Sequence, residues 1–91
     1  MPTIDIKRSH NLGKAAGRAA AEQVANRLKD KVEATWKWVG DDIVFERTGA
    51  KGRIAVTDTT VHIEIDLSLV LRPLKGMLES KANKYLDEYI K

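Results

Sequence analysis

Hydrophobic and polar residues alternate along five stretches of the chain, a period typical of half-buried β-strands. In the first stretch, residues 3–7, Ile4 and Ile6 point to one side and their neighbours are polar. After residue 34 the alternation returns at residues 35–39, 42–48, 51–57 and 60 to about 71. Two residues separate each of these stretches from the next, the length of a tight hairpin. The separators are Gly40-Asp41, Gly49-Ala50 and Asp58-Thr59.

The three predicted hairpins can be checked against one another, because a one-residue slip would turn every side chain of a strand to the opposite face. The closing pairs are expected to be Val39–Asp42, Thr48–Lys51 and Thr57–Thr60. They align two apolar rows, Trp38–Ile43–Val56–Val61 and Trp36–Phe45–Ile54–Ile63. The other face receives the row Thr35–Glu46–Arg53–Glu64, with Lys51 opposite Asp66. We therefore expect a sheet with one apolar face and one polar face.

Two other segments carry apolar residues at the 3.6-residue period of a helix. With Ser9 as its N-cap, the first helix runs to about Val32. Its expected buried stripe is Leu12, Ala16, Ala19, Ala20, Val24, Leu28 and Val32. The second helix starts at Pro73 and runs to about Ile90. It is expected to bury Leu74, Leu78, Ala82, Tyr85, Leu86 and Tyr89.

The sheet and both helices each have one apolar face, and stacking the helices on the apolar side of the sheet buries all three. The predicted fold is therefore α+β: a βαββββα two-layer sandwich, in which an antiparallel meander sheet carries both helices on one face. It resembles a reduced helix-grip fold. The last strand, with Leu67, Leu69 and Leu71, extends past its neighbour. We expect the first strand to cover it, in the order 2-3-4-5-1, and a homodimer through this edge is the alternative.

Composition narrows the class of protein. The chain has 91 residues, 43% of them hydrophobic, and no cysteine. A disulfide framework, a Cys-ligated metal site and a thiol nucleophile are therefore excluded. No apolar run exceeds three residues, and no charged-then-apolar leader opens the chain, so we expect neither a membrane span nor export. These features predict a single cytoplasmic domain over residues 1–91.

Charge argues against a nucleic-acid partner. The net charge is +3, and basic residues are more frequent in the first third of the chain. One group of cations is Lys7, Arg8, Lys14 and Arg18, and a second is Arg47, Lys51 and Arg53. Acidic residues interleave with the second group, and the polar sheet face has no aromatic platform. We therefore expect no nucleic-acid binding.

Residues that could carry catalysis or bind a metal are few. Removal of Met1 would leave Pro2 as an N-terminal amine, the general base of tautomerase-like enzymes, and such an enzyme is one alternative. Ser9 and His10 are interpreted as a helix cap and a first-turn residue rather than as parts of a triad. Three residues on one strand face are too few for a closed metal site; they are His62, Glu64 and Asp66. We expect no catalytic residue, no cofactor and no metal.

Binding of an apolar ligand or surface is the remaining class of function. The candidate residues are Trp36, Trp38, Phe45, Arg47, Leu69, Val70, Leu71, Met77 and Tyr85. The alternation of residues places Arg47 on the apolar face of the sheet. Its guanidinium would suit a ligand carboxylate at the mouth of a pocket. Alternatively, its methylene groups cover apolar surface while the guanidinium reaches water. A second alternative is therefore a small carrier with a pocket between the second helix and the sheet. That pocket would be lined by Trp36, Phe45, Ile65, Leu69, Met77 and Tyr85.

Three segments, MPTIDIKRSHNLG, FERTGAKGRI and LRPLKG, resemble the polyhydroxyalkanoic acid system family. Its members are small bacterial proteins encoded beside genes for polyhydroxyalkanoate synthesis and granules, and the resemblance spans nearly the whole chain. It implies a bacterial cytoplasmic protein connected with storage-polyester granules, and it carries over no catalytic residue because the family has none established. We therefore expect a non-enzymatic accessory or binding protein that acts at the polyhydroxyalkanoate granule surface or on granule proteins. The expected docking patch is the apolar overhang Leu67, Leu69, Val70 and Leu71.

Overall fold

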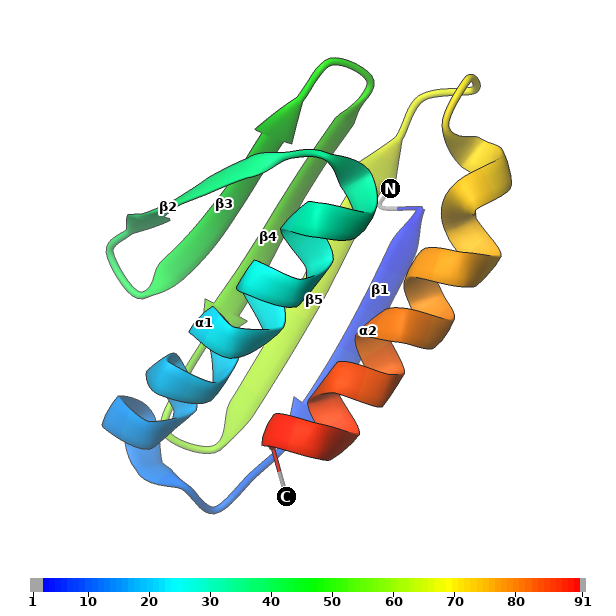
Figure 1. Cartoon of the computed structure of the whole chain (residues 1–91). Helices are drawn as coiled ribbons and strands as arrows, with labels where there is room; N and C mark the ends of the chain where they lie inside the picture. The colour runs from blue at the N-terminus through cyan, green and yellow to red at the C-terminus, as the bar shows by residue number, and fades with distance from the viewer. Residues whose placement is uncertain (1–2, 91) are drawn as a thin grey trace.

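The computed structural model describes residues 3–90, and over this range the chain forms a five-stranded antiparallel sheet with two α-helices on one face (Figure 1). The strands are β1 (Ile4–Ser9), β2 (Thr35–Val39), β3 (Asp42–Arg47), β4 (Ala50–Val56) and β5 (Thr60–Leu67). The helices are α1 (Gly13–Val32) and α2 (Lys75–Tyr89), and a short 3-10 helix, Arg72–Leu74, precedes α2. Across the sheet the order is β1-β5-β4-β3-β2. The predicted α+β fold, its βαββββα element order and the strand order are confirmed.

The helices pack against the same face of the sheet and against each other. One cluster of buried apolar side chains lies between the two layers. The sheet contributes Ile43, Ile54 and Ile63, and α2 contributes Leu78 and Leu86, all fully shielded from water. Burial of side chains of this size stabilises the fold by roughly 1.5–3 kcal/mol each. The core therefore joins the helix layer to the middle of the sheet.

The register of the middle hairpin differs from the predicted one by two residues. The β2–β3 and β4–β5 hairpins pair as predicted. Between β3 and β4, however, Arg47 rather than Thr48 closes the hairpin, opposite Ala50. Thr48 and Gly49 then form the turn, and Gly49 takes a left-handed φ of +86°, which glycine adopts without strain. A shift of two residues leaves every side chain on its predicted face.

The shift changes which side chains meet across the sheet. Phe45 lies opposite Gly52 instead of Ile54. Its ring covers that glycine closely, since a Cβ on Gly52 would lie 3.3 Å from the Phe45 Cδ2 atom. The two predicted apolar rows are therefore wrong beyond β3. The observed rows are Trp38–Ile43–Ile54–Ile63 and Trp36–Phe45–Gly52–Ile65.

The outer face of the sheet changes in the same way. Lys51 lies opposite Asp66, as predicted. Lys51 also faces Glu46 on the other side, whereas Arg53 lies opposite Val44 instead of Glu46 and forms an ion pair with Asp42 at 3.6 Å. The predicted pairing of Arg53 with Glu64 is confirmed.

Helix α1 starts later than predicted and buries a different stripe. Ser9 is the last residue of β1, opposite Thr60, and so does not cap the helix, which begins at Gly13. The residues of the predicted stripe that are exposed instead are Leu12, Ala16 and Ala19. The buried stripe is Gly17, Ala20, Ala21, Val24, Ala25, Leu28 and Val32. Gly17 allows this close packing, because a Cβ there would lie 2.9 Å from Cε1 of His10.

Strand β5 ends at Leu67, four residues before its predicted end at Leu71, so the expected overhang is not part of the strand. β1 pairs with residues 60–65 of β5. The Ser68 N–H still donates to the Gly49 carbonyl at 2.8 Å, one pair beyond Ala50–Leu67, and the chain then leaves the sheet in a turn that the Leu71 N–H closes on the Ser68 carbonyl, at 3.1 Å. The extended edge that motivated a homodimer is thus absent from residues 60–71, and a dimer stays a prediction.

The second helix follows its prediction closely. Pro73 lies in the 3-10 helix that leads into α2. The side chains that α2 buries are Leu78, Ala82, Tyr85 and Leu86. Leu74 and Tyr89 are partly buried against the same core. No helix within residues 3–90 is long and apolar enough to cross a membrane.

Candidate functional site

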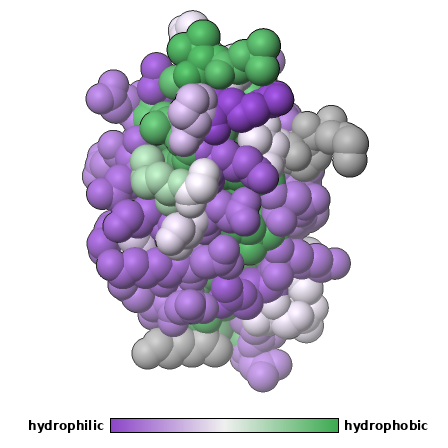
Figure 2. All heavy atoms as spheres, turned by 90° about the vertical axis from the view of Figure 1, so that its right-hand side faces the viewer, coloured by the Kyte–Doolittle hydropathy of each residue, from purple (hydrophilic) through white to green (hydrophobic). Residues whose placement is uncertain are grey.

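One corner of the molecule carries apolar side chains that are wholly or partly exposed to water. Leu69 and Val70, in the turn between β5 and the 3-10 helix, are 78% and 85% exposed. Met77, in the first turn of α2, is 37% exposed, and Leu71 and Leu74 are partly buried beside these residues. We call these five residues the apolar corner. Figure 2 shows apolar side chains gathered at the top of this side of the molecule, above a largely hydrophilic surface.

Backbone hydrogen bonds hold the turn that carries the apolar corner. The Ser68 N–H donates to the Gly49 carbonyl at 2.8 Å, and the Leu71 N–H donates to the Ser68 carbonyl at 3.1 Å. The Leu71 side chain lies over Gly49, where a Cβ would be 3.2 Å from its Cδ1 atom. Leu69 and Val70 are therefore presented to solvent by a defined turn and are not the frayed end of a strand.

The structure divides the predicted site residues into three groups. Four of them belong to the apolar corner: Leu69, Val70, Leu71 and Met77. Leu67, which the sequence placed in the same patch, is buried. Phe45 and Tyr85 are core residues, 5% and 2% exposed, and present no surface to a docking partner. The third group, Trp36, Trp38 and Arg47, lies at the other edge of the sheet, against α1.

The two tryptophans are bound to α1 by polar partners. Trp36 and Trp38 lie partly buried on β2, with their rings in a T-shaped contact 6.3 Å apart. The Nε1–H of Trp36 donates to Oδ1 of Asn26, at 3.1 Å. The guanidinium of Arg18 lies 4.2 Å from the centre of the Trp38 ring. These contacts explain both indoles as the joint between the edge strand and the helix.

Arg47 reaches the C-terminal end of α1. Its Nη1–H donates to the Val32 carbonyl at 2.6 Å, and its Nε–H donates to the Thr48 carbonyl at 3.1 Å. The last carbonyls of a helix have no partner within the helix and attract a cation. The guanidinium therefore uses two of its five N–H groups to hold the β3–β4 hairpin to α1.

The space between the helices and the sheet is small. A cavity of about 20 Å³ is lined by Leu28, Val32, Phe45, Gly52, Ile65 and Leu78. This volume holds about one water molecule, whereas a drug-sized ligand needs roughly 300 Å³ or more. Of the predicted pocket residues, Phe45 and Ile65 lie at this cavity, while Leu69 and Met77 lie in the apolar corner. The predicted place for a carrier pocket is therefore filled by side chains.

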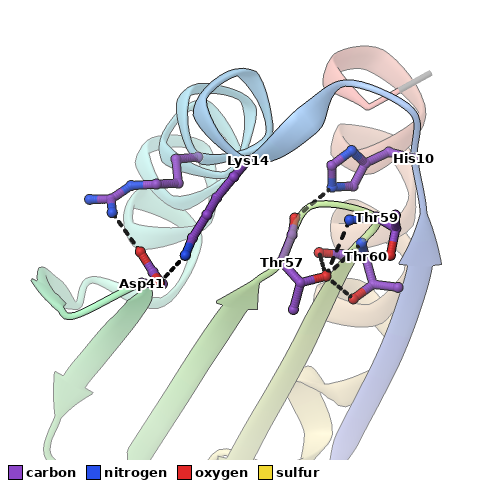
Figure 3. A network of polar contacts seen from close by, with 7 residues as sticks. His10, Lys14, Asp41, Thr57, Thr59 and Thr60 are labelled. Carbon is purple, nitrogen blue, oxygen red and sulfur yellow. Dashed lines mark hydrogen bonds and ion pairs between the residues drawn. The ribbon is translucent and has the colours of Figure 1, made fainter.

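The opposite end of the sheet carries a polar network (Figure 3). We call it the polar end; its residues are His10, Lys14, Arg18, Asp41, Thr57, Thr59 and Thr60. His10 is 4% exposed and its backbone N–H donates to the Thr59 carbonyl at 2.8 Å. The imidazole Nδ1 accepts from the Leu12 N–H at 3.1 Å. Nε2 therefore carries the proton of the neutral ring and donates to the Thr57 carbonyl at 3.2 Å.

The two catalytic arrangements considered from the sequence have different outcomes. His10 uses both ring nitrogens on backbone groups, so it is a structural residue and not a base for Ser9. It was expected in the first turn of the helix and lies instead in the connection before it. Pro2 lies outside the residues that the structure describes, and the tautomerase-like enzyme that depends on it stays an alternative.

Asp41 joins the β2–β3 turn to α1. Lys14 Nζ lies 2.5 Å from Asp41 Oδ2, and Arg18 Nη1 lies 2.7 Å from Oδ1. The hydrogen bond from Lys14, reinforced by the charges of both cations, holds the pKa of the Asp41 carboxyl below its usual value of 3.8. Arg8 likewise contacts Asp87 of α2 at 2.5 Å. Arg53 Nε lies 3.6 Å from Asp42 Oδ2, so four of the cations considered for nucleic-acid binding have carboxylate partners among the described residues.

On the outer face of the sheet His62 meets carboxylates from two strands. Its Nε2 contacts Asp5 on β1, and its Nδ1 lies 3.7 Å from Glu64. Asp5 is 57 positions away in the chain, so only the pairing of β1 with β5 reveals it. Asp66, the third residue of the group that we expected to be too small for a metal site, faces Lys51 instead. Within residues 3–90 no group of three or more His, Asp or Glu residues is placed to hold a metal ion.

Comparison with known proteins gives one further finding. The family model described as polyhydroxyalkanoic acid system protein matches residues 4–90. This range begins with β1 and ends just after α2, and it includes the apolar corner and the polar end. The resemblance found in the sequence is confirmed by this match. No curated protein and no solved structure gives a significant match, so the likeness to a helix-grip fold stays a prediction.

Proposed function

The chain belongs to the polyhydroxyalkanoic acid system protein family, and from this premise we propose a non-enzymatic accessory protein that docks on polyester granules in the bacterial cytoplasm. The family description connects the chain with a system whose material is a polyester of hydroxy acids. The observation that carries the proposal is the apolar corner, where Leu69 and Val70 are exposed on a turn held by hydrogen bonds. Direct contact with the polymer is the simplest role for such a corner.

The shape of the corner suits an extended surface better than a small ligand. A solid polyester presents alkyl and ester groups to water over a wide area. When apolar side chains that project from a turn contact such a surface, both the side chains and the polymer surface under them leave water. This contact does not require a pocket. A small apolar ligand would need a pocket far larger than the cavity of about 20 Å³ in the core.

The expected strength of docking follows from the exposed side chains. Burial of Leu69 and Val70 contributes roughly 3–5 kcal/mol when most of their surface leaves water. This alone corresponds to weak, reversible association. We therefore expect the protein to exchange on and off the granule rather than to insert permanently.

Sedimentation of purified protein with amorphous poly(3-hydroxybutyrate) particles at physiological salt tests the proposal. The double variant Leu69→Ser/Val70→Ser should bind at least about 30-fold more weakly, because it removes most of the apolar surface available for docking. The matched control is Leu12→Ser/Val39→Ser, which also replaces one leucine and one valine. Those residues are 39% and 50% exposed but lie outside the apolar corner, so the control should bind like the wild type.

Two results would contradict the proposal. If the wild-type protein stays in the supernatant, it does not dock directly on the polymer. An equal loss of binding in both double variants would show general hydrophobic adsorption and no specific corner. The absence of catalysis is checked on the same particles, from which the protein should release no soluble hydroxy acid above the protein-free rate.

A further inference from the structure

We infer that the apolar corner has a cationic rim, formed by Arg72 and Lys75, that recognises carboxylate groups on the polymer. The preferred surface is then an acid-terminated polyester and not every apolar solid. This inference rests on the proposed function and specifies the chemistry of the surface that the corner binds.

The chain around the apolar corner carries unbalanced positive charge. Residues 67–78 contain Arg72, Lys75 and no acidic residue, although the whole chain has 16 basic and 13 acidic residues. Both cations are exposed. Neither forms an ion pair with another residue of the described range 3–90, whereas Arg8, Lys14, Arg18, Lys29 and Arg53 do. The two side chains are therefore available to an anion outside the protein.

The local backbone places the two cations together. Arg72 is the first residue of the 3-10 helix, and the Lys75 N–H donates to the Arg72 carbonyl. Residues three apart in a 3-10 helix lie nearly above one another, so both side chains leave the same side of the turn. Leu71 and Leu74, which precede them, pack against the core. The two cations thus belong to the same segment as the apolar corner. The corner and the two cations together form one composite surface.

The chemistry of a hydroxy-acid polyester matches this composite surface. Each linear chain ends in one hydroxyl and one carboxyl group, and the carboxyl group is ionised at neutral pH. Chain ends at a particle surface scatter negative charges among alkyl and ester groups. A guanidinium binds a carboxylate through two parallel hydrogen bonds, and an ammonium adds a second point charge. Leu69 and Val70 would contact the polymer while Arg72 and Lys75 meet its chain ends.

The test compares two double variants that remove the same charge. Arg72→Gln/Lys75→Gln alters the rim, and Lys81→Gln/Lys84→Gln alters later turns of the same helix. The probe is poly(3-hydroxybutyrate) in two forms, with free carboxyl ends or with methyl-esterified ends. At low salt the rim variant should bind the free-acid particles about tenfold more weakly than the wild type. The control variant should lose less than about twofold, because its charges lie away from the contact.

The esterified particles complete the test. On them the wild type and both variants should bind with equal affinity, since no carboxylate is left for the rim. On free-acid particles, high salt should make the three affinities equal in the same way. Equal losses in the rim and control variants would overturn the inference, because only net charge would then matter. A rim loss that persists on esterified particles would overturn it as well.

Failure of the proposed function has a separate signature. If the wild type binds neither particle form, direct docking and the rim inference are both wrong. If Leu69→Ser/Val70→Ser abolishes binding while the rim variant keeps full affinity for free-acid particles, docking holds and the rim inference alone is wrong. Binding of the wild type to vesicles of anionic phospholipid, but not to polymer, would also reject an acid-terminated polyester as the partner.

Discussion

The two ends of the sheet, which lie far apart in Figure 1, use their side chains in opposite ways. At the polar end His10 is buried, with its backbone N–H and both ring nitrogens bonded to backbone groups, and Asp41 is paired with two cations. At the apolar corner Leu69 and Val70 are exposed and contribute nothing to the core. The polar end is thus explained by folding alone. The apolar corner is not, and contiguous exposed apolar residues of this kind mark interaction surfaces.

The largest effect should come from breaking the polar end at His10. His10→Ala leaves the Thr57 carbonyl and the Leu12 N–H without their partners and opens a cavity above Gly17. We expect the free energy of unfolding to fall by about 2–4 kcal/mol, measured by urea denaturation. His62→Ala, at a half-buried position on the outer face of β5, is the control and should cost less than about 1 kcal/mol. If His10→Ala lowers the free energy of unfolding by less than about 1 kcal/mol, the polar end does not stabilise the fold.

A smaller effect of the same sign is expected from Gly17. Alanine is the better helix former, but a Cβ at Gly17 would lie 2.9 Å from the His10 ring. Gly17→Ala should therefore lower stability by about 1–3 kcal/mol in thermal unfolding. Gly76, in α2 beside the apolar corner, has no atom within 4 Å of such a Cβ, and Gly76→Ala should raise stability by about 0.5–1 kcal/mol. The contrast between the ends fails if both substitutions stabilise the protein.

The ion pairs of Asp41 predict a modest dependence of stability on pH. The hydrogen bond from Lys14 lowers the pKa of Asp41 in the folded protein, so the unfolded chain, with a pKa near 3.8, binds the proton more tightly. The stability contributed by this carboxylate is therefore present above pH 3.8 and is lost as the pH falls through the lower folded pKa. Urea curves of the wild type and Asp41→Asn should differ at pH 7 and approach one another in acid, with a smaller difference in high salt. A difference that does not change with pH would contradict this account.

The smallest effect on stability is expected at the apolar corner. Because Leu69 and Val70 are exposed in the free protein, Leu69→Ser/Val70→Ser should change the free energy of unfolding by no more than about 0.5 kcal/mol. The same variant is expected to lose binding to polyester particles. Urea denaturation of the purified variant measures the first quantity independently of the second. A destabilisation above about 1 kcal/mol would show that these residues support the fold, and the comparison between the ends would no longer hold.

The residues of the apolar corner were predictable, but their arrangement was not. Alternation continues through Leu67, Leu69 and Leu71, and this pattern indicates a strand. The strand stops because its partner β4 begins only at Ala50 and because the chain turns at Ser68, whose carbonyl accepts from the Leu71 N–H. The point at which a neighbouring strand begins leaves no trace in the hydrophobic period of the strand beside it. For the same reason the contacts His62–Asp5 and Arg8–Asp87 appear only once the strands and helices are placed.

The sequence by itself determined the kind of each element, the polarity of the sheet faces and the fold class, because periods of 2 and 3.6 residues are local properties of the chain. Two-residue turns also determined the outer two hairpin registers. Only the tertiary structure decided the middle register, because Gly49 can occupy either position of its turn and a two-residue shift preserves every face. It also decided which side of α1 is buried and which leucines stay in water. These two outcomes depend on how closely separate elements approach one another. Gly17 lets α1 approach the His10 ring, and Gly49 lets the Leu71 side chain approach the β3–β4 turn.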